Sequence, residues 1–187
     1  MLSNIFEFSV ELAYSFFLLF ILLRFLLQIV KANFYHPIIQ SIVKITNPII
    51  LPIRRITPII NAYDWSCILA ILLLGIIKYV VFMSLGIITP LSPLALIGVV
   101  LLDILRYTVY IYLFAYILQA IGSWLGSSPR KTVFLSLLNM LTTPVNRKFP
   151  LKLEVGAVDF RPTVIILLLF IALRVINHFT AKLLFFF

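Results

Sequence analysis

Four long stretches of this chain are almost wholly apolar, and polar positions recur at intervals between them. The stretches cover about Phe8 to Val30, Trp65 to Ile88, Leu94 to Trp124 and Pro162 to Phe185. The hydrocarbon core of a bilayer is about 30 Å thick and needs roughly 20 apolar residues per helix, so each stretch is long enough to cross it. Continuous runs such as SFFLLFILL lack the alternation of a membrane β-barrel strand. The pattern predicts an all-α membrane protein with four transmembrane helices.

The connector between the first two stretches, residues 31–64, follows a helical period. His36, Gln40, Lys44 and Asn47 recur every three or four residues, and isoleucine and valine fill most positions between them. The twelve residues from His36 to Asn47 make about 18 Å of helix, which is too short to span a bilayer. We therefore expect an amphipathic helix that lies in the plane of the cytoplasmic headgroups, with its apolar side toward the lipid.

Prolines punctuate this connector. Pro37 suits the first turn of the helix, and Pro48 is expected to end it, because the residue before a proline is pushed out of α geometry. Pro52 and Pro58 each remove a further backbone donor. The segment after Pro48 is thus predicted to be kinked and semi-rigid, without a regular helix.

The chain also contains an internal repeat, which becomes visible when it is shifted by about 95 residues. The alignment pairs Arg24 with Gln119, Pro48 with Pro144, Arg54 and Arg55 with Arg147 and Lys148, and Asp64 with Asp159, and it nearly pairs Lys78 with Arg174. Each unit, residues 1–90 and 91–187, is predicted to comprise a span, a connector (31–64 or 125–161) and a second span. Because each unit crosses the membrane twice, the two form a parallel repeat about an axis along the membrane normal.

Charge sets the expected orientation. The chain is 63% hydrophobic and only 11% charged, with a formal net charge of +9. Its cations gather in the two connectors: Lys31, Lys44, Arg54 and Arg55 in the first, and Arg130, Lys131, Arg147, Lys148, Lys152 and Arg161 in the second. The loop GIITPLSP between the second and third spans is uncharged, and the N-terminal tail is acidic. The positive-inside rule therefore predicts cytoplasmic connectors and two non-cytoplasmic termini.

These residues resemble a known family. The segments LLRFLLQIV and NFYHPIIQSIVKITNPIILPIRRITPI, with the following DW, are similar to the repeat of the YggT family of small bacterial and plastid membrane proteins, which carry two such repeats. The second copy, TTPVNRKFPLKLEVGAVDF, lacks the middle proline. The resemblance implies an integral protein of the bacterial inner (plasma) membrane or the thylakoid, with no assigned reaction. It also implies links to osmotic-stress tolerance, cell division or nucleoid organisation, and assembly of cytochrome complexes.

The connectors supply one set of candidate site residues. A cation at the cytoplasmic interface contributes about 1 kcal/mol through attraction to anionic lipid. The candidate lipid- or partner-binding residues are Lys44, Pro48, Pro52, Arg54, Arg55, Pro58, Arg147 and Lys148. The simpler alternative is that these are ordinary positive-inside charges and loop prolines. Recurrence of a proline and a basic pair in both units favours the binding interpretation.

Charges within the spans supply a second set. An ionisable group in hydrocarbon costs at least about 2.5 to 3.5 kcal/mol and needs water, headgroups or a partner. Arg24 lies near the cytoplasmic end of its span and is expected to snorkel. From their depths we predict a cluster of Glu11, Lys78, Asp103, Arg106 and Arg174. Structural pairing, or snorkelling to the outer headgroups, is the preferred interpretation, and a transport path through these charges is the alternative.

The sequence shows no catalytic machinery. It has no Gly-rich phosphate loop and no Ser-His-Asp set, and His36, His178 and Cys67 do not make up a metal-ligand set. We therefore expect no enzyme, no cofactor and no metal. We also expect no nucleic-acid partner, because the cations lie on membrane-embedded connectors near lipid phosphate. The first hypothesis is a scaffold or assembly factor that binds anionic lipid and a membrane-protein partner or a second copy. The alternative is a permeation element for ions or small solutes.

Overall fold

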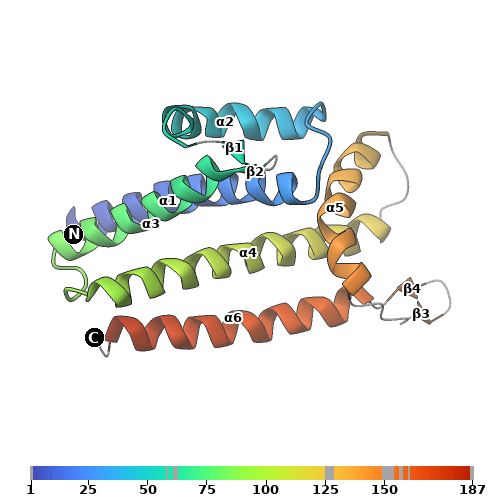
Figure 1. Cartoon of the computed structure of the whole chain (residues 1–187). Helices are drawn as coiled ribbons and strands as arrows, with labels where there is room; N and C mark the ends of the chain where they lie inside the picture. Colours follow the sequence, from blue (N-terminus) through green and yellow to red (C-terminus); the bar gives the residue numbers. More distant parts are fainter. Residues whose placement is uncertain are drawn as a thin grey trace.

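The computed structural model describes residues 2–57, 59–60, 63–124, 129–148, 154–155, 158–159 and 161–185. Within these residues the chain forms six helices and two short antiparallel β-hairpins (Figure 1). In order they are α1 (Leu2–Ile29), α2 (Pro37–Arg54), β1 (Ile59–Ile60), β2 (Tyr63–Asp64), α3 (Trp65–Ser84), α4 (Pro93–Trp124), α5 (Pro129–Lys148), β3 (Glu154–Val155), β4 (Val158–Asp159) and α6 (Arg161–Phe185).

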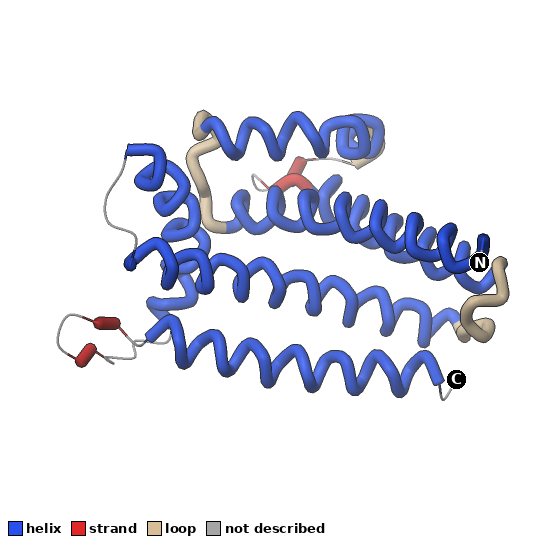
Figure 2. The backbone as a smooth tube through the Cα atoms, turned by 180° about the vertical axis from the view of Figure 1, so that it is seen from behind, coloured by secondary structure: helices blue, strands red, loops and turns tan. Residues whose placement is uncertain are grey.

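Four of these helices are long and apolar enough to cross a membrane. They are α1, α3, α4 and α6, with candidate spans at Ile5–Ile29, Trp65–Ser84, Pro93–Ile121 and Arg161–Leu184. The prediction of a helical protein with four spans is confirmed, and the chain is a multi-pass membrane protein. Figures 1 and 2 show the two chain ends at the same end of the bundle, as two helical hairpins require.

The order of elements occurs twice along the chain. The series α1, α2, β1, β2, α3 is followed by α4, α5, β3, β4, α6. In the first hairpin Ile59 pairs with Asp64 and Ile60 with Tyr63, and in the second Glu154 pairs with Asp159 and Val155 with Val158. The hairpins therefore have the same register, and they place Asp64 and Asp159 at equivalent positions, as the sequence alignment pairs them.

The first connector differs from the prediction at its prolines. Pro48 does not end the helix, because α2 runs without interruption from Pro37 to Arg54 and contains both Pro48 and Pro52. Both prolines lie on the exposed side of α2, so their rings and the carbonyls that lose a donor are not forced into the core. The axis bends instead, and Figure 1 shows the last turns of α2 end-on while the earlier turns lie in the plane of the view.

The two connector helices occupy different positions. α2 packs along the flank of α1 and α3, whereas α5 crosses the end of α4 (Figure 1). Side chains of α1 and of the start of α3 hold α2 against its own hairpin. That α2 lies in the plane of the cytoplasmic headgroups stays a prediction.

The amphipathic pattern of α2 is present in the structure. Ile39, Ile42 and Ile50 are buried against α1 and α3, while Gln40 and Lys44 are exposed. Lipid chains are as apolar as leucine, so burial of apolar surface between spans gives little driving force within a bilayer. Close packing and polar contacts between helices therefore matter most for holding this bundle together.

A glycine lets two of the spans approach closely. A Cβ atom added to Gly75 of α3 would lie 2.6 Å from Cγ1 of Val100 in α4, which no real contact allows. Small residues at such a contact allow the backbones of two spans to come together. This close approach brings Lys78 of α3 next to Asp103 of α4.

Candidate functional site

A buried carboxylate on α4 is the centre of the polar contacts between the spans. Asp103 is fully buried. Its Oδ2 atom accepts a hydrogen bond from Tyr79 Oη at 2.9 Å and from Tyr14 Oη at 3.3 Å. Its Oδ1 atom accepts one from Arg106, one turn further along the same helix. Asp103 thereby connects α4 to α1 and α3.

Lys78 of α3 lies between two acids. Its Nζ atom is 2.9 Å from Oε2 of Glu11 and 3.3 Å from Oδ2 of Asp103, and its side chain is only 5% exposed. The ammonium group also lies over the rings of Tyr14, at 4.4 Å from the centroid, and Tyr79, at 4.9 Å. Aromatic faces attract such a cation, most strongly where water is excluded.

Four charges at this site neutralise one another. Glu11 and Asp103 supply two negative charges, and Lys78 and Arg106 supply two positive ones. An isolated charge at this depth would cost several kcal/mol, and partners in hydrogen-bond contact remove most of that cost. The arrangement can therefore hold α1, α3 and α4 in a fixed register. We call these four residues the charge cluster.

Arg174 is not part of the charge cluster. It lies on the exposed face of α6, where it lines a surface hollow with Asn177 and His178. Depth along a span does not determine the face on which a residue lies, and Arg174 lies on a face of α6 that does not pack against the cluster. The buried face of α6, which includes Leu173 and Ile176, packs against α4.

A hydroxyl pair continues the polar contacts toward the connectors. Ser15 Oγ of α1 lies 2.5 Å from Tyr107 Oη of α4, and the Tyr107 ring meets Tyr14 edge to face with centroids 6.1 Å apart. Hydrogen bonds of this kind between spans typically contribute about 0.6 to 2 kcal/mol. They join α1 to α4 across the boundary between the two repeats.

Arg24 binds the first connector to α1. Its Nη1 atom donates to Thr46 Oγ1 at 2.8 Å and to Asn47 Oδ1 at 3.0 Å, both on α2. The side chain is 7% exposed. The expectation that Arg24 snorkels to the headgroups is wrong, because α2 lies back along α1 and brings polar partners to the arginine. Asn47 likewise faces α1 and does not belong to the outer polar stripe.

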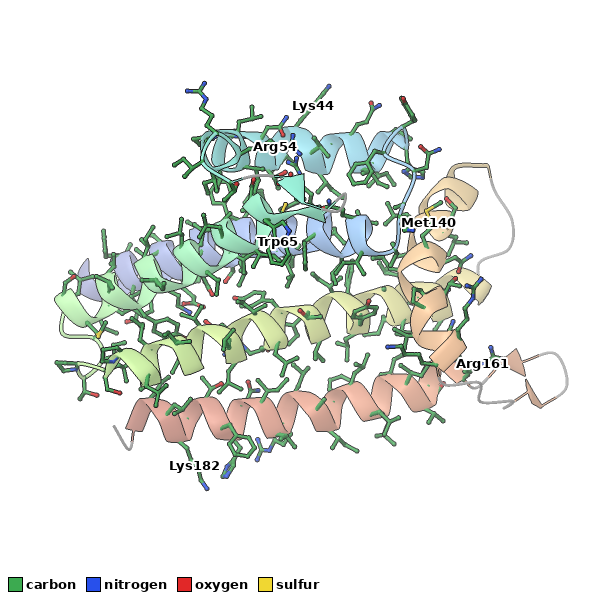
Figure 3. All side chains as sticks on the ribbon, viewed as in Figure 1. Lys44, Arg54, Trp65, Met140, Arg161 and Lys182 are labelled. Atoms are coloured by element: carbon green, nitrogen blue, oxygen red, sulfur yellow. The ribbon has the colours of Figure 1, made fainter. Side chains whose placement is uncertain are left out.

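A second contact fixes the far end of α2. Arg54 Nη2 lies 2.5 Å from Oδ2 of Asp64, which is buried at the start of α3. Asp64 Oδ1 also accepts the backbone N–H of Ser66 at 3.2 Å, so it caps α3 while it binds the arginine. Figure 3 shows Arg54 beneath α2, on the side toward Trp65. Arg54, a predicted lipid-binding residue, is therefore engaged within the protein.

The other predicted connector residues lie at the surface. Lys44, Pro48, Pro52 and Arg55 of the first connector and Arg147 and Lys148 at the end of α5 are exposed. Figure 3 shows Lys44 extending away from the bundle. Pro58 lies outside the described residues. Both residues of the predicted basic pair of the first connector are thus exposed, and Arg54, whose side chain is 40% exposed, also pairs with Asp64.

The second repeat has an equivalent contact with different chemistry. Gln119 Nε2 of α4 donates to Thr142 Oγ1 of α5 at 3.2 Å and to Asn139 Oδ1. Tyr116 Oη donates to Asn146 Oδ1 at 2.8 Å in the same interface. Each repeat therefore uses a long polar side chain of its first span to hold its connector through a threonine.

An apolar groove lies beneath the two connectors. Its volume is about 630 Å³, and residues from α1, α2, α4 and α5 line it. Leu23, Ile42, Phe114 and Leu141 represent the four helices. A groove of this size and composition falls within the range of sites that take a small apolar molecule or an acyl chain.

Comparison with known proteins identifies the family. A family model described as CCB3/YggT matches residues 3–85 and 91–180, which correspond to the two halves of the fold. The chain belongs to the CCB3/YggT family. It is 32% identical over 170 residues to the protein named "Uncharacterized protein YggT" of Escherichia coli K12, covering 90% of this chain and 87% of that protein.

A second relative of this CCB3/YggT chain comes from another bacterium. The "Uncharacterized protein in proC 3'region" of Vibrio alginolyticus is 30% identical over 179 residues, covering 93% of this chain and 92% of that protein. No solved structure matches the chain. The two matched segments agree with the double arrangement of elements. Because no solved structure matches, the site is interpreted from its own contacts.

Several residues of the site in this CCB3/YggT chain were not found from the sequence. Tyr14 and Tyr79 look like packing residues inside apolar runs, and only the fold places their hydroxyls on Asp103. The contact of Arg24 with Thr46 was also missed, because Arg24 was expected to snorkel. The repeat alignment, which pairs Arg24 with Gln119, was the signal that could have revealed it, because two long polar side chains at equivalent places indicate a shared partner.

Proposed function

We propose that this protein is a non-enzymatic membrane scaffold whose connectors gather anionic lipid at the cytoplasmic face of the inner membrane. The observation that supports the proposal is the arrangement of cations around α2. Arg24 of α1 and Arg54 of α2 hold the helix against the spans, while Lys44 of α2 and Arg55, the next residue after α2, are exposed. A fixed helix with outward cations presents charge in a set place, which a flexible basic loop does not.

The second connector extends the same surface chemistry. Arg147 and Lys148 are exposed at the end of α5, and Gln119 holds that helix to α4. Each exposed cation near an anionic leaflet contributes about 1 kcal/mol. The apolar groove beneath both connectors offers a place for the acyl chain of a bound lipid.

The charge cluster supports a structural role better than a permeation path. Lys78 and Asp103 are buried, and each already contacts groups of opposite charge. A permeation site has to bind an ion and release it, so its groups must exchange partners readily. The permeation alternative therefore has less support than the scaffold.

Energy transfer from tryptophan to lipid tests the proposal. The chain has two tryptophans, so Trp124→Phe leaves Trp65, which is 46% exposed at the start of α3, as the only donor. The protein is reconstituted in phosphatidylcholine vesicles that contain dansyl-labelled phosphatidylglycerol or dansyl-labelled phosphatidylcholine. We expect stronger transfer to the anionic probe, and weaker preference at high salt because salt screens exposed charges.

Variants of α2 provide the decisive comparison. Lys44→Gln with Arg55→Gln removes about 2 kcal/mol of attraction, so the preference for the anionic lipid should fall roughly thirtyfold. Gln40→Ala, on the same exposed side of α2, is the matched control and should leave the preference unchanged. Equal transfer to both probes, or a preference that survives loss of both cations, would contradict the proposal.

A further inference from the structure

Arg174 lies near the middle of a membrane span. α6 runs from Arg161 to Phe185, so Arg174 is about 16 to 20 Å along the axis from either end. Snorkelling serves residues near the ends of a span. An arginine at the centre needs a polar partner within the membrane, because exposure to hydrocarbon costs at least about 2.5 to 3.5 kcal/mol.

The partner does not come from the neighbouring span. Leu173, Ile176 and Thr180 form the buried face of α6, which packs against α4. Arg174 and His178 lie on the opposite face. α6 is also the least buried candidate span. Within the 18-residue apolar stretch of each span, 22% is buried in α6, against 39%, 44% and 39% in α1, α3 and α4.

Arg174 shares its exposed face with two other polar residues. Asn177 and His178 follow at the spacing that places side chains together on one side of a helix. The three line a hollow of about 600 Å³, with Ala181 one turn beyond. Polar residues inside spans almost always face a protein or a water-filled cavity, and small residues let a second helix approach closely.

Glu7 lies in the second turn of α1, near the end of its span and away from the middle level of Arg174. The carboxylates nearer the middle of the spans are engaged inside the bundle. Glu11 contacts Lys78, and Asp103 contacts Lys78 and Arg106. Asp64 is bound to Arg54 at the first connector. A second copy of the chain could offer one of these acids to Arg174 only by breaking its own contacts. Charge complementarity therefore favours a different protein.

We propose that the face of α6 formed by Arg174, Asn177 and His178 binds a transmembrane helix of another membrane protein, and that this helix carries an aspartate or glutamate near its midpoint. The guanidinium group offers a planar pair of donors that fits a carboxylate, and this contact is strong where water is excluded. Asn177 and His178 add donors and acceptors on either side. The bound helix removes Arg174 from the lipid.

This inference gives the proposed scaffold a partner and uses a separate surface. The lipid experiment depends on Lys44 of α2 and on Arg55, the next residue after it, whereas the partner face depends on α6. Failure of one experiment therefore leaves the other interpretable.

Photo-crosslinking with defined peptides tests the partner face. The full chain carries p-benzoylphenylalanine in place of Phe170, which is 53% exposed and one turn from Arg174 on the same face. It is reconstituted with a fluorescent polyleucine transmembrane peptide that has aspartate or leucine at its midpoint. We expect roughly fivefold or more crosslinking to the aspartate peptide. Arg174→Leu should reduce it to the leucine level, and Arg174→Lys should keep a large part of it.

A control position distinguishes specific binding from chance encounter. Phe16 lies near the middle of α1 and is 47% exposed, so the same crosslinker there samples lipid at a similar depth. It should label both peptides equally and weakly, in the parent chain and in Arg174→Leu alike. Equal labelling of the two peptides from position 170, labelling that Arg174→Leu does not change, or adducts dominated by a second copy of the chain would overturn the proposal.

Discussion

The Nζ atom of Lys78 lies 2.9 Å from Oε2 of Glu11 and 3.3 Å from Oδ2 of Asp103, so one buried ammonium group bridges α1, α3 and α4. Removal of the ammonium breaks the ion pair of Glu11 and leaves Asp103 with Arg106 and the hydroxyls of Tyr14 and Tyr79. Loss of one member of a buried pair typically costs about 3 to 5 kcal/mol, because the remaining charge stays buried without compensation.

Lys78→Met should therefore lower the free energy of unfolding by about 3 to 5 kcal/mol, measured by chemical denaturation in detergent. Lys44→Met, at an exposed cation of α2, is the control and should change it by less than about 0.5 kcal/mol. The double variant of Lys78→Met with Asp103→Asn should lose less than the sum of the two single losses, because the two residues interact directly. Additive losses would show that the pair is not coupled.

Much of this fold is predictable because the bilayer restricts the choices. The length and composition of the four apolar stretches were enough to locate α1, α3, α4 and α6, and depth alone brought Glu11, Lys78 and Asp103 to one level. Arg174 shows the limit, because depth does not determine on which face of a helix a residue lies. Its partner-free face becomes visible only when α6 is seen packed against α4.

The connectors were harder to predict because their positions depend on tertiary contacts. Pro48 looked like the end of a helix, yet the cost of a proline is local and is reduced on the exposed side of α2. Arg24 looked like a snorkelling residue because its partners, Thr46 and Asn47, come near only when α2 lies back along α1. No local pattern contains that information.

Arg24 offers a test of how the first connector is held. Arg24→Leu removes the donors to Thr46 and Asn47 and weakens the attachment of α2 to α1, at a cost of about 1 to 3 kcal/mol. Amide hydrogen exchange should then become roughly ten- to hundredfold faster in α2 and stay unchanged in α6. Arg24→Gln is the matched variant, because Gln119 holds the second connector through Thr142, and it should keep most of the protection. Unchanged exchange in Arg24→Leu would mean that other contacts position the helix.

Close approach of α3 and α4 can be tested at Gly75. The added methyl group of Gly75→Ala would lie 2.6 Å from Cγ1 of Val100, so the Val100 side chain or the two helices must shift. We expect a loss of about 1 to 3 kcal/mol in the free energy of unfolding. Adding Val100→Ala should recover part of that loss by making room. A Gly75→Ala protein as stable as the parent would show that the two helices are not in tight contact.

Ion flux separates the scaffold from the permeation alternative. Purified protein in liposomes should pass no more protons or potassium than empty liposomes, because Lys78 and Asp103 are engaged with each other and with neighbouring groups. Flux is followed with a pH dye and a potassium electrode under an imposed gradient. Substantial flux in the parent protein that is lost in Lys78→Ala would favour a path through the charge cluster.

The most direct test of the account is the side of the membrane on which the connectors lie, because anionic lipid binding in the cytoplasmic leaflet requires Lys44 and Arg55 to face it. Figure 1 shows both chain ends at one end of the bundle. Alkaline phosphatase fused after Phe187 should be active, and green fluorescent protein at the same place should be dark. A silent phosphatase with a bright fluorescent fusion would place the connectors on the outer side and contradict the account.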